Sequence, residues 1–417
     1  MKLRNRLIAL ACLLAFAGLG VLYLRTWVVQ KPFGIILFVS DGFSGSRLAA
    51  ARMYAGGADN RLNLERFPAL ALVSNHSADF AVPDAAAAAS AVATGTTVAN
   101  RALATAPDGR PLPSLLALAA DKGRATGLIT NGRLSDPAPA AFYAHAPNAS
   151  DREALVAQLA RDPRLTLILG GGGDDFLPES KEGGRKDGRD LLLELRQQGY
   201  EVLRTGPDLE NTPAWRFPKV LGLFGRSELP WSNNPLAGGQ EPSLSDMVRS
   251  AIGLLQFNRG GYLLVVDAGL VGHAASANRG EQTLAELVEL DRAIHTARSF
   301  AGDNALIVAV GLQSTGGFAL NGFPLRKDNG AALLGPNSSG IPSITWATGP
   351  NGPAESPAPE GTDPRGLAPA REPAAHAAPA AIPTAEDPVA IGIGPGSEAV
   401  RGFLDNTDLF RILSGQL

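Results

Sequence analysis

The sequence has little cysteine and little charge. Its 417 residues contain one cysteine, Cys12, which excludes a framework of disulfides within the chain. Charged side chains make up 18% of the residues and leave a formal net charge of −3. Because nucleic-acid binding usually requires a basic surface, this balance predicts no nucleic-acid partner. Apolar residues reach 45%, enough to fill the core of one large domain or of two ordinary ones.

A long apolar run lies near the N-terminus. Lys2, Arg4 and Arg6 precede this run, which extends from Leu7 to Leu24. A run of about 18 apolar residues is just long enough to cross a bilayer, and basic residues ahead of it stay in the cytoplasm. We therefore predict a transmembrane signal anchor in residues 1–30, with residues 31–417 in the periplasm. The alternative is a signal peptide cleaved after residues 15–17, which would release a secreted domain.

Short apolar runs alternate with helical stretches along residues 31–417. The runs are typical of buried parallel strands, and the alternation predicts a three-layer α/β/α sandwich with a mostly parallel central sheet. The expected strands cover residues 34–39, 125–130, 165–169, 262–267, 305–310 and 389–393, and the expected helices cover 46–54, 112–122, 151–159, 190–198, 281–300 and 407–413. Residues 349–386 are rich in proline and alanine, and we predict a surface loop or a disordered insert there.

Three aspartates follow the expected strands. Asp41, Asp136 and Asp267 fall at or just beyond strand ends, where ligands of open α/β sheets bind. Three carboxylates at this edge could hold one Mg²⁺ or Ca²⁺ together with water. The alternative is a structural role, in which they cap helices and accept hydrogen bonds from loop amides.

Several short segments of the sequence match segments of a known protein family and follow one another in the same order. They cover residues 38–44, 83–95, 133–145, 167–172 and 290–294, with a further match at 384–387. These segments resemble those of alkaline phosphatases in sequence and in order, so the chain is identified as a member of that family. The resemblance implies a phosphomonoesterase fold in which a serine attacks phosphorus, two zinc ions hold the attacking and leaving oxygens, and a magnesium ion lies beside them.

The nucleophilic serine of the family has no counterpart here. Its position is taken by Ala85, which follows Asp84 and opens a run of five alanines. Alanine has no group to activate, so this position cannot form a phosphoserine. Ser90 is the nearest hydroxyl along the helix, but it is turned away from position 85 and is predicted to be a packing residue.

The resemblance also implies positions for the zinc ligands. Asp41 matches the carboxylate that bridges zinc and magnesium, but five other positions do not keep the ligand. They are occupied by Gly272, Ser276, Leu312, Gln313 and Pro383. His273 falls beside these positions and is predicted to lie behind the ligands or to face solvent, and His376 is a weak substitute for the residue at Pro383. The phosphate-binding arginine aligns near Ala149, with Arg152 as an alternative that also fits a helix start. We therefore predict that both zinc sites are lost.

These replacements favour an alkaline-phosphatase-like protein of the cell envelope that is inactive or strongly impaired, a pseudophosphatase. One alternative is an active phosphoric-ester hydrolase with a rearranged site, using water on a metal held by Asp41, Asp136 and Asp267. Another is a scaffold that binds phosphate, a phosphorylated small molecule or a protein partner without cleaving it. The resemblance also implies a homodimer.

Overall fold

A computed structural model describes residues 2–26, 33–214, 219–234, 239–321, 342–353 and 372–417. Twelve α-helices are described in this part of the chain: α1 Lys2–Thr26, α2 Gly45–Gly56, α3 Ala85–Thr94, α4 Leu115–Asp121, α5 Pro137–Ala140, α6 Arg152–Leu159, α7 Leu191–Gln197, α8 Gly206–Glu210, α9 Leu244–Leu255, α10 Gly269–Ser276, α11 Gly280–Ala301 and α12 Asp408–Ser414.

Ten strands form the central sheet in the order β15-β2-β14-β8-β1-β7-β3-β4-β6-β5. Their bounds are β1 Gly34–Ser40, β2 Ala69–Ser74, β3 Ala125–Arg133, β4 Leu167–Gly171, β5 Tyr200–Leu203, β6 Lys219–Leu223, β7 Tyr262–Asp267, β8 Ala305–Gly311, β14 Val389–Ile393 and β15 Arg401–Asp405. Neighbouring strands pair in parallel except at β14, which is antiparallel to both β8 and β2. The mostly parallel sheet predicted from the sequence is therefore confirmed.

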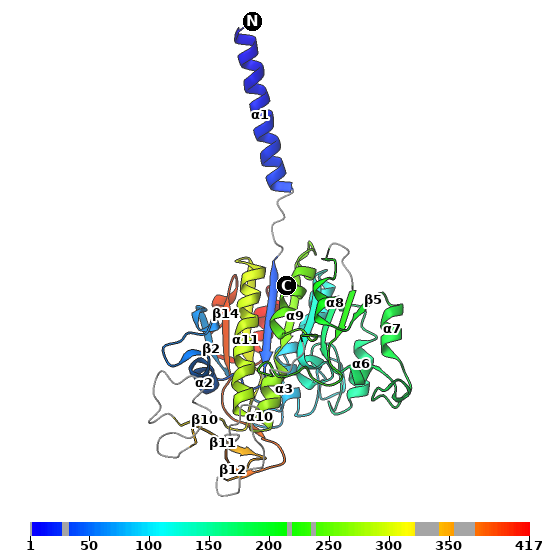
Figure 1. Ribbon diagram of the computed structural model, residues 1–417, viewed down its shortest axis with the longest axis vertical. Helices are drawn as coiled ribbons and strands as arrows, with labels where there is room; N and C mark the ends of the chain where they lie inside the picture. The colour runs from blue at the N-terminus through cyan, green and yellow to red at the C-terminus, as the bar shows by residue number, and fades with distance from the viewer. Residues whose placement is uncertain (1, 27–32, 215–218, 235–238, 322–341, 354–371) are drawn as a thin grey trace.

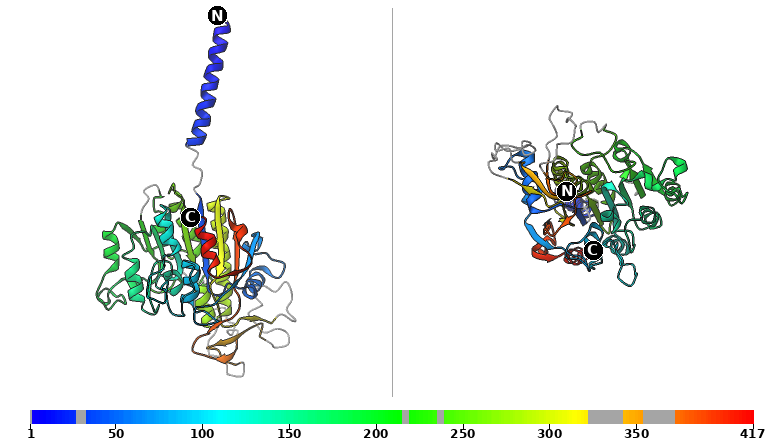
Figure 2. Two further views of the ribbon diagram at one scale, coloured as in Figure 1. Left: turned by 180° about the vertical axis from the view of Figure 1, so that it is seen from behind. Right: turned by 90° about the horizontal axis from the view of Figure 1, so that it is seen from below.

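Helices cover both faces of this sheet. Strand β1 shows why, because its side chains alternate between two cores: Ile35, Leu37 and Val39 face one, and Ile36 and Phe38 face the other. The first core is closed by α3, α4, α5, α6, α7 and α12, and the second by α2, α9, α10 and α11. Figure 1 is viewed from the side of α9 and α11, and the left view of Figure 2 shows the opposite side. This arrangement confirms the three-layer α/β/α prediction.

Smaller strands lie after β8. Strands β10 (Ala319–Leu320), β11 (Ile344–Gly349) and β12 (Ala374–Ala377) form a three-stranded sheet, and β13 (Pro383–Thr384) pairs with β9 (Ser314–Thr315). Figure 1 shows the three-stranded sheet below the lower end of the central sheet, where β1 ends. Because β12 and β13 fall within residues 349–386, that segment is not entirely the loop that its composition predicts. Its residues 354–371 lie outside the described part.

Three other segments differ from the sequence-based expectation or add to it. The stretch after β7, which carries the implied zinc-ligand positions Gly272 and Ser276, forms helix α10. Strand β4 begins at Leu167 rather than at residue 165. The N-terminal run forms α1, in which the window Arg4–Val21 is long and apolar enough to cross a membrane. No part of that window is buried against the rest of the chain. A signal sequence near an N-terminus meets the same criteria.

Candidate functional site at the carboxyl end of the sheet

The structure brings the three predicted aspartates together. Asp41 follows β1 and Asp267 ends β7, and these two strands are neighbours in register. Asp136 lies just beyond β3, which pairs with the other side of β7. The three carboxyl groups interact electrostatically, since each of Asp41 and Asp136 raises the pKa of Asp267. The site therefore lies at the carboxyl edge of β1, β7 and β3, as the strand order of an open α/β sheet leads one to expect.

Asp267 is buried, with 1% of its surface exposed. Burial raises the pKa of its carboxyl to about 8, although a hydrogen bond from Thr130 acts in the opposite direction. The Thr130 hydroxyl donates to Oδ2 at 2.7 Å, while the buried Oδ1 has no hydrogen-bond partner among the described residues. A buried oxygen without a partner is costly, so Oδ1 is an open position for a proton, a water or a cation.

Asp41 is packed between Gln313 and Gly272, two residues at positions that the resemblance assigns to zinc ligands. The Gln313 side-chain amide lies 3.4 Å from its Oδ2, and a Cβ atom on Gly272 would lie 2.7 Å from its Cβ. Its Oδ1 is shut off from solvent and has no described partner, and burial raises the pKa of the carboxyl to about 6. The space beside Gly272 is therefore filled by Asp41.

Asp136 is paired with a histidine. The Nε2 atom of His273, on α10, lies 3.2 Å from Oδ2 of Asp136, which also accepts from the Arg133 backbone amide at 2.9 Å. Burial alone lowers the pKa of His273, but Asp136 and further carboxyl groups outweigh it, so the pKa is raised. His273 therefore belongs to the acidic cluster.

A buried arginine completes the cluster. Arg47, in the first turn of α2, is 0% exposed, and its Nη2 donates to the carbonyl of Thr315. Its guanidinium lies 5.8 Å from the ring centroids of both Phe318 and Trp346. Burial lowers its pKa to about 10, and the charges of Glu386 and Asp41 oppose that change. Arg47 thus stays charged at neutral pH and supplies a fixed positive charge beside Asp41.

The segment that carries the nucleophile in the family forms helix α3. Asp84 is its N-cap and accepts from the Ala87 amide at 2.9 Å and from the Arg101 amide at 2.6 Å. Ala85 is the first helical residue, and α3 packs on α5, the helix that follows Asp136. The Ser90 hydroxyl is buried, donates to the Ala86 carbonyl at 2.6 Å and accepts from the Ala104 amide at 2.8 Å. Ser90 is therefore the packing residue predicted from its helical position.

The remaining candidates have local structural roles. Pro383 pairs with Thr315, the residue whose carbonyl accepts from Arg47, and Leu312 is buried in the core. Ser276 ends α10 and its carbonyl accepts from the Ala381 amide at 2.8 Å. Two further candidates, His376 on β12 and Arg152 at the start of α6, are exposed. Within the described residues, no three His, Cys, Asp or Glu side chains are grouped as ligands of one ion.

Sequence reasoning missed Arg47 and Thr130. Neither residue type is diagnostic, and Thr130 is hidden within a strand of apolar neighbours. A signal for Arg47 exists in the sequence, because it lies six residues after Asp41 at the start of an alanine-rich helix. The pairing of this charge with Asp41 depends on the turn between β1 and α2, which the sequence pattern does not specify.

Comparisons with known proteins agree with this geometry. A family model described as alkaline phosphatase matches residues 34–416. An alkaline phosphatase of Gadus morhua is 28% identical over 354 residues, covering 73% of each chain. A streptomycin-6-phosphate phosphatase of Streptomyces griseus is 28% identical over 434 residues, covering 92% of this chain and 90% of its own. The crystal structure of Thermus thermophilus alkaline phosphatase is 26% identical with a TM-score of 0.73, covering 93% of this chain and 92% of its own.

Proposed function

The chain belongs to the alkaline phosphatase family, and on that premise we propose that it is a pseudophosphatase, inactive or strongly impaired as a phosphomonoesterase. Its relatives include a phosphatase that acts on a phosphorylated small molecule, so the ligand proposed for this site is also a phosphoric ester or phosphate. The proposal depends on what stands at the reacting positions, and two features support it.

The first feature is the start of helix α3. Ala85 has only a methyl group where a nucleophile would stand, and the N-cap Asp84 is engaged by two backbone amides. The Ser90 hydroxyl is fully used by backbone groups within the helix and its neighbouring loop. None of these three residues offers a free nucleophile, so a phosphoenzyme route has no starting atom at this helix.

The second feature, which carries the proposal, is the buried guanidinium of Arg47. It bonds to Thr315, whose partner in the small β-ladder is Pro383, a former zinc-ligand position. It also acts on the charge of Asp41, which contacts Gln313 and Gly272, two more such positions. A permanent cation here would repel a metal ion held on the Pro383 side of the cluster and would itself partly neutralise Asp41. We infer that Arg47 replaces some of the positive charge that the metals supply in the family.

One hard cation still fits part of the cluster. Asp41 and Asp267 each leave a buried Oδ1 without a partner, and Mg²⁺ often binds through one or two carboxylates with its remaining positions filled by water. Asp136 would stand beside it, held by His273. Bound there, Mg²⁺ or Ca²⁺ would polarise an anionic ligand, while Thr130 fixes the orientation of Asp267. Elemental analysis showing neither ion in the purified chain after incubation would contradict this site.

A binding role without catalysis is the second candidate. Among the described residues, Arg47 leaves Nε and Nη1 without a hydrogen-bond partner, and the buried hydroxyl of Ser314, which precedes Thr315, has no described partner either. Such donors suit a phosphate or another oxyanion, which arginine recognises through several hydrogen bonds at once. Stabilisation of the chain by inorganic phosphate without turnover would support binding, and absence of any shift in melting temperature would count against it.

The proposed activity is tested by incubating the full-length chain in detergent with an aryl phosphate, Zn²⁺ and Mg²⁺. We expect no turnover above that of an Asp41→Ala variant prepared in the same way. Turnover that depends on Asp41 would contradict the pseudophosphatase and would favour an active hydrolase with a rearranged site. Because both samples pass through the same purification, a contaminating phosphatase would appear equally in each.

We propose that α1 anchors the protein in the membrane with the folded domain on the periplasmic side. The basic residues Arg4 and Arg6 at the start of the apolar window support this orientation. Protease added to intact spheroplasts should therefore digest the domain. A domain that is cut only after the membrane is broken would place it in the cytoplasm instead.

A further inference from the structure

A pocket lies at the same edge of the sheet but over other strands. It has a volume of about 300 Å³ and is formed where β4, β6 and β5 end, whereas the acidic cluster belongs to β1, β7 and β3. Its lining residues are Gly173, Asp174, Leu177, Lys181, Glu182, Arg204, Leu223, Phe224, Gly225 and Arg226. Three of these carry a positive charge and two a negative charge.

Not every charged side chain that lines this pocket is paired with another lining residue. Arg226 is engaged, since its Nε lies 3.0 Å from Oδ1 of Asp174 and its Nη2 donates to the Glu182 carbonyl at 2.7 Å. Lys181 is paired with Asp190, outside the pocket, at 2.7 Å. Arg204 differs, because its guanidinium makes no hydrogen bond or ion pair with any residue that the structure describes. Its backbone amide alone is bonded, to Asp208.

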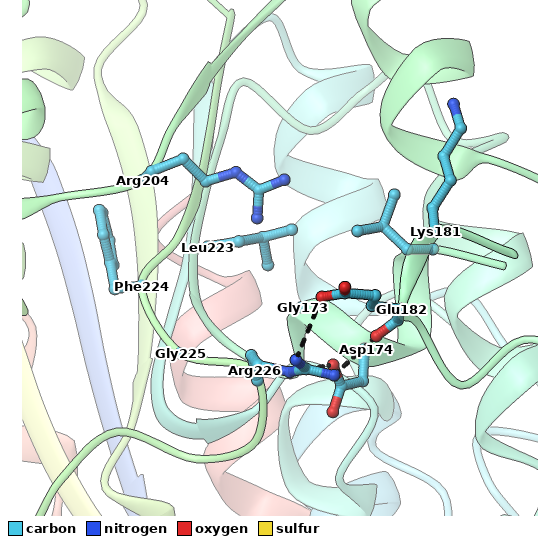
Figure 3. Close-up of a pocket in the computed structure, with 10 residues that line it drawn as sticks. Gly173, Asp174, Lys181, Glu182, Arg204, Leu223, Phe224, Gly225 and Arg226 are labelled. Atoms are coloured by element: carbon cyan, nitrogen blue, oxygen red, sulfur yellow. Dashed lines mark hydrogen bonds and ion pairs between the residues drawn. The ribbon is translucent and has the colours of Figure 1, made fainter. Parts of the chain in front are cut away.

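Arg204 also extends into the pocket. Figure 3 shows its guanidinium pointing toward the middle of the lining residues and ending level with Leu223, while Arg226 is turned toward Asp174 and Glu182. Partial burial lowers the pKa of Arg204 and the nearby positive charge of Arg196 lowers it further, while the charge of Asp190 acts in the opposite direction. Because Asp190 is itself paired with Lys181, the partly buried Arg204 guanidinium has no directly bonded negative partner among the described residues. The remaining wall is apolar, made by Leu223 and Phe224, both nearly buried, and by Leu177.

We propose that this pocket binds a small organic anion, whose single negative group pairs with Arg204 and whose apolar part lies against Phe224, Leu223 and Leu177. Arginine binds carboxylate and phosphate oxygens alike, and the volume accommodates a ligand of about one ring, at the lower limit of small-molecule sites. Nothing in the pocket is placed to attack the ligand, because its polar side chains are cations and paired carboxylates. The pocket is therefore a binding site, independent of whether the acidic cluster is catalytic.

Calorimetric titration of the full-length chain with benzoate and with phenyl phosphate tests this site. Both probes carry one ring and an anionic group, so both should bind, and inorganic phosphate, which lacks the ring, should bind more weakly. Arg204→Gln should weaken benzoate binding about tenfold or more, because it removes a charge-assisted hydrogen bond. Benzoate reports on this pocket alone if the proposed function fails, since it is not a phosphoric ester.

Arg196→Gln is the matched control. It removes the same charge from an exposed position on α7, close enough to influence Arg204 but outside the lining of the pocket. Its benzoate affinity should fall far less than that of Arg204→Gln, and both variants should keep the same melting temperature. Failure of benzoate to bind the unchanged chain would overturn the proposal. Equal loss of binding in the two variants would overturn it as well, because benzoate would then respond to the overall positive charge of this region and not to Arg204 itself.

Discussion

Replacing Gly272 by aspartate, the residue type that the family carries there, is expected to destabilise this chain rather than to rebuild a zinc site. A Cβ atom at Gly272 would lie 2.7 Å from Cβ of Asp41 and 3.2 Å from its Oδ2. The new side chain would therefore have to displace Asp41, and overpacking of this kind typically costs about 1 to 3 kcal/mol. Two carboxylates forced together add repulsion. Denaturant unfolding with and without Zn²⁺ measures both effects.

Alanine substitutions at two helical glycines separate the steric cause of the destabilisation from charge repulsion. Gly272→Ala on α10 meets Asp41, whereas Gly253→Ala on α9 meets no atom within 4 Å. Alanine favours a helix over glycine by about 1 kcal/mol, so Gly253→Ala should stabilise the chain and Gly272→Ala should destabilise it. If Gly272→Asp were as stable as the unchanged chain and retained zinc, the claim that Asp41 has closed the ligand position would be wrong.

The free energy of unfolding is expected to fall as the pH rises from about 5 to 8. Burial raises the pKa of Glu286 and of Glu372 from 4.5 to about 7, so the folded chain still holds protons that the unfolded chain has released. Wherever the folded state binds more protons, stability falls with rising pH. A shift of this size corresponds to about 3 kcal/mol for each group, lost between the unfolded and folded pKa values. Burial also raises the pKa values of Asp41 and Asp267, so these two groups contribute to stability with the same dependence on pH.

Glutamine variants show which carboxyl groups cause the free energy of unfolding to fall with rising pH. In Glu372→Gln the side-chain oxygen can still accept from the Gly280 amide, at 2.7 Å, and from the Trp346 indole, at 3.0 Å, so only the titration is removed. Unfolding curves at several pH values should show a smaller slope for this variant and a gain in stability above pH 7. Glu201→Gln, at an exposed position on β5, should leave the slope unchanged. A stability that rises from pH 5 to 8 would show that these carboxyl groups are not protonated in the fold.

The sequence predicted the layers because their signals are local. The run at residues 34–39 is apolar at every position, and β1 is buried on both faces for that reason. The alternating strand β2, with every second residue exposed, was not predicted, since its alanines give a weak pattern. Helix α10 was not predicted either, because the resemblance implied zinc-ligand positions in this stretch rather than a regular helix. The two-residue strands β9 and β13 exist only because they pair with each other, and each is too short to show a hydrophobic pattern in the sequence.

The acidic cluster could be predicted only in part. Asp41, Asp136 and Asp267 follow strands, and a parallel sheet places such residues at one edge. The partners could not be predicted, because they depend on tertiary contacts between distant segments. Arg47 reaches Thr315 across 268 positions of sequence, and Thr130 reaches Asp267 across 137. The pocket around Arg204 likewise requires the ends of β4, β5 and β6 to meet, which sequence spacing alone does not reveal.

The central claim is that the zinc chemistry of the family has been removed as a unit, and that Ala85 is only one part of this loss. The most direct measurement is aryl phosphate hydrolysis by the full-length Ala85→Ser variant with Zn²⁺ and Mg²⁺, together with elemental analysis of zinc in the same sample. The account predicts no hydrolysis above that of the unchanged chain and no retained zinc. Hydrolysis restored by this single hydroxyl, with zinc bound, would contradict it.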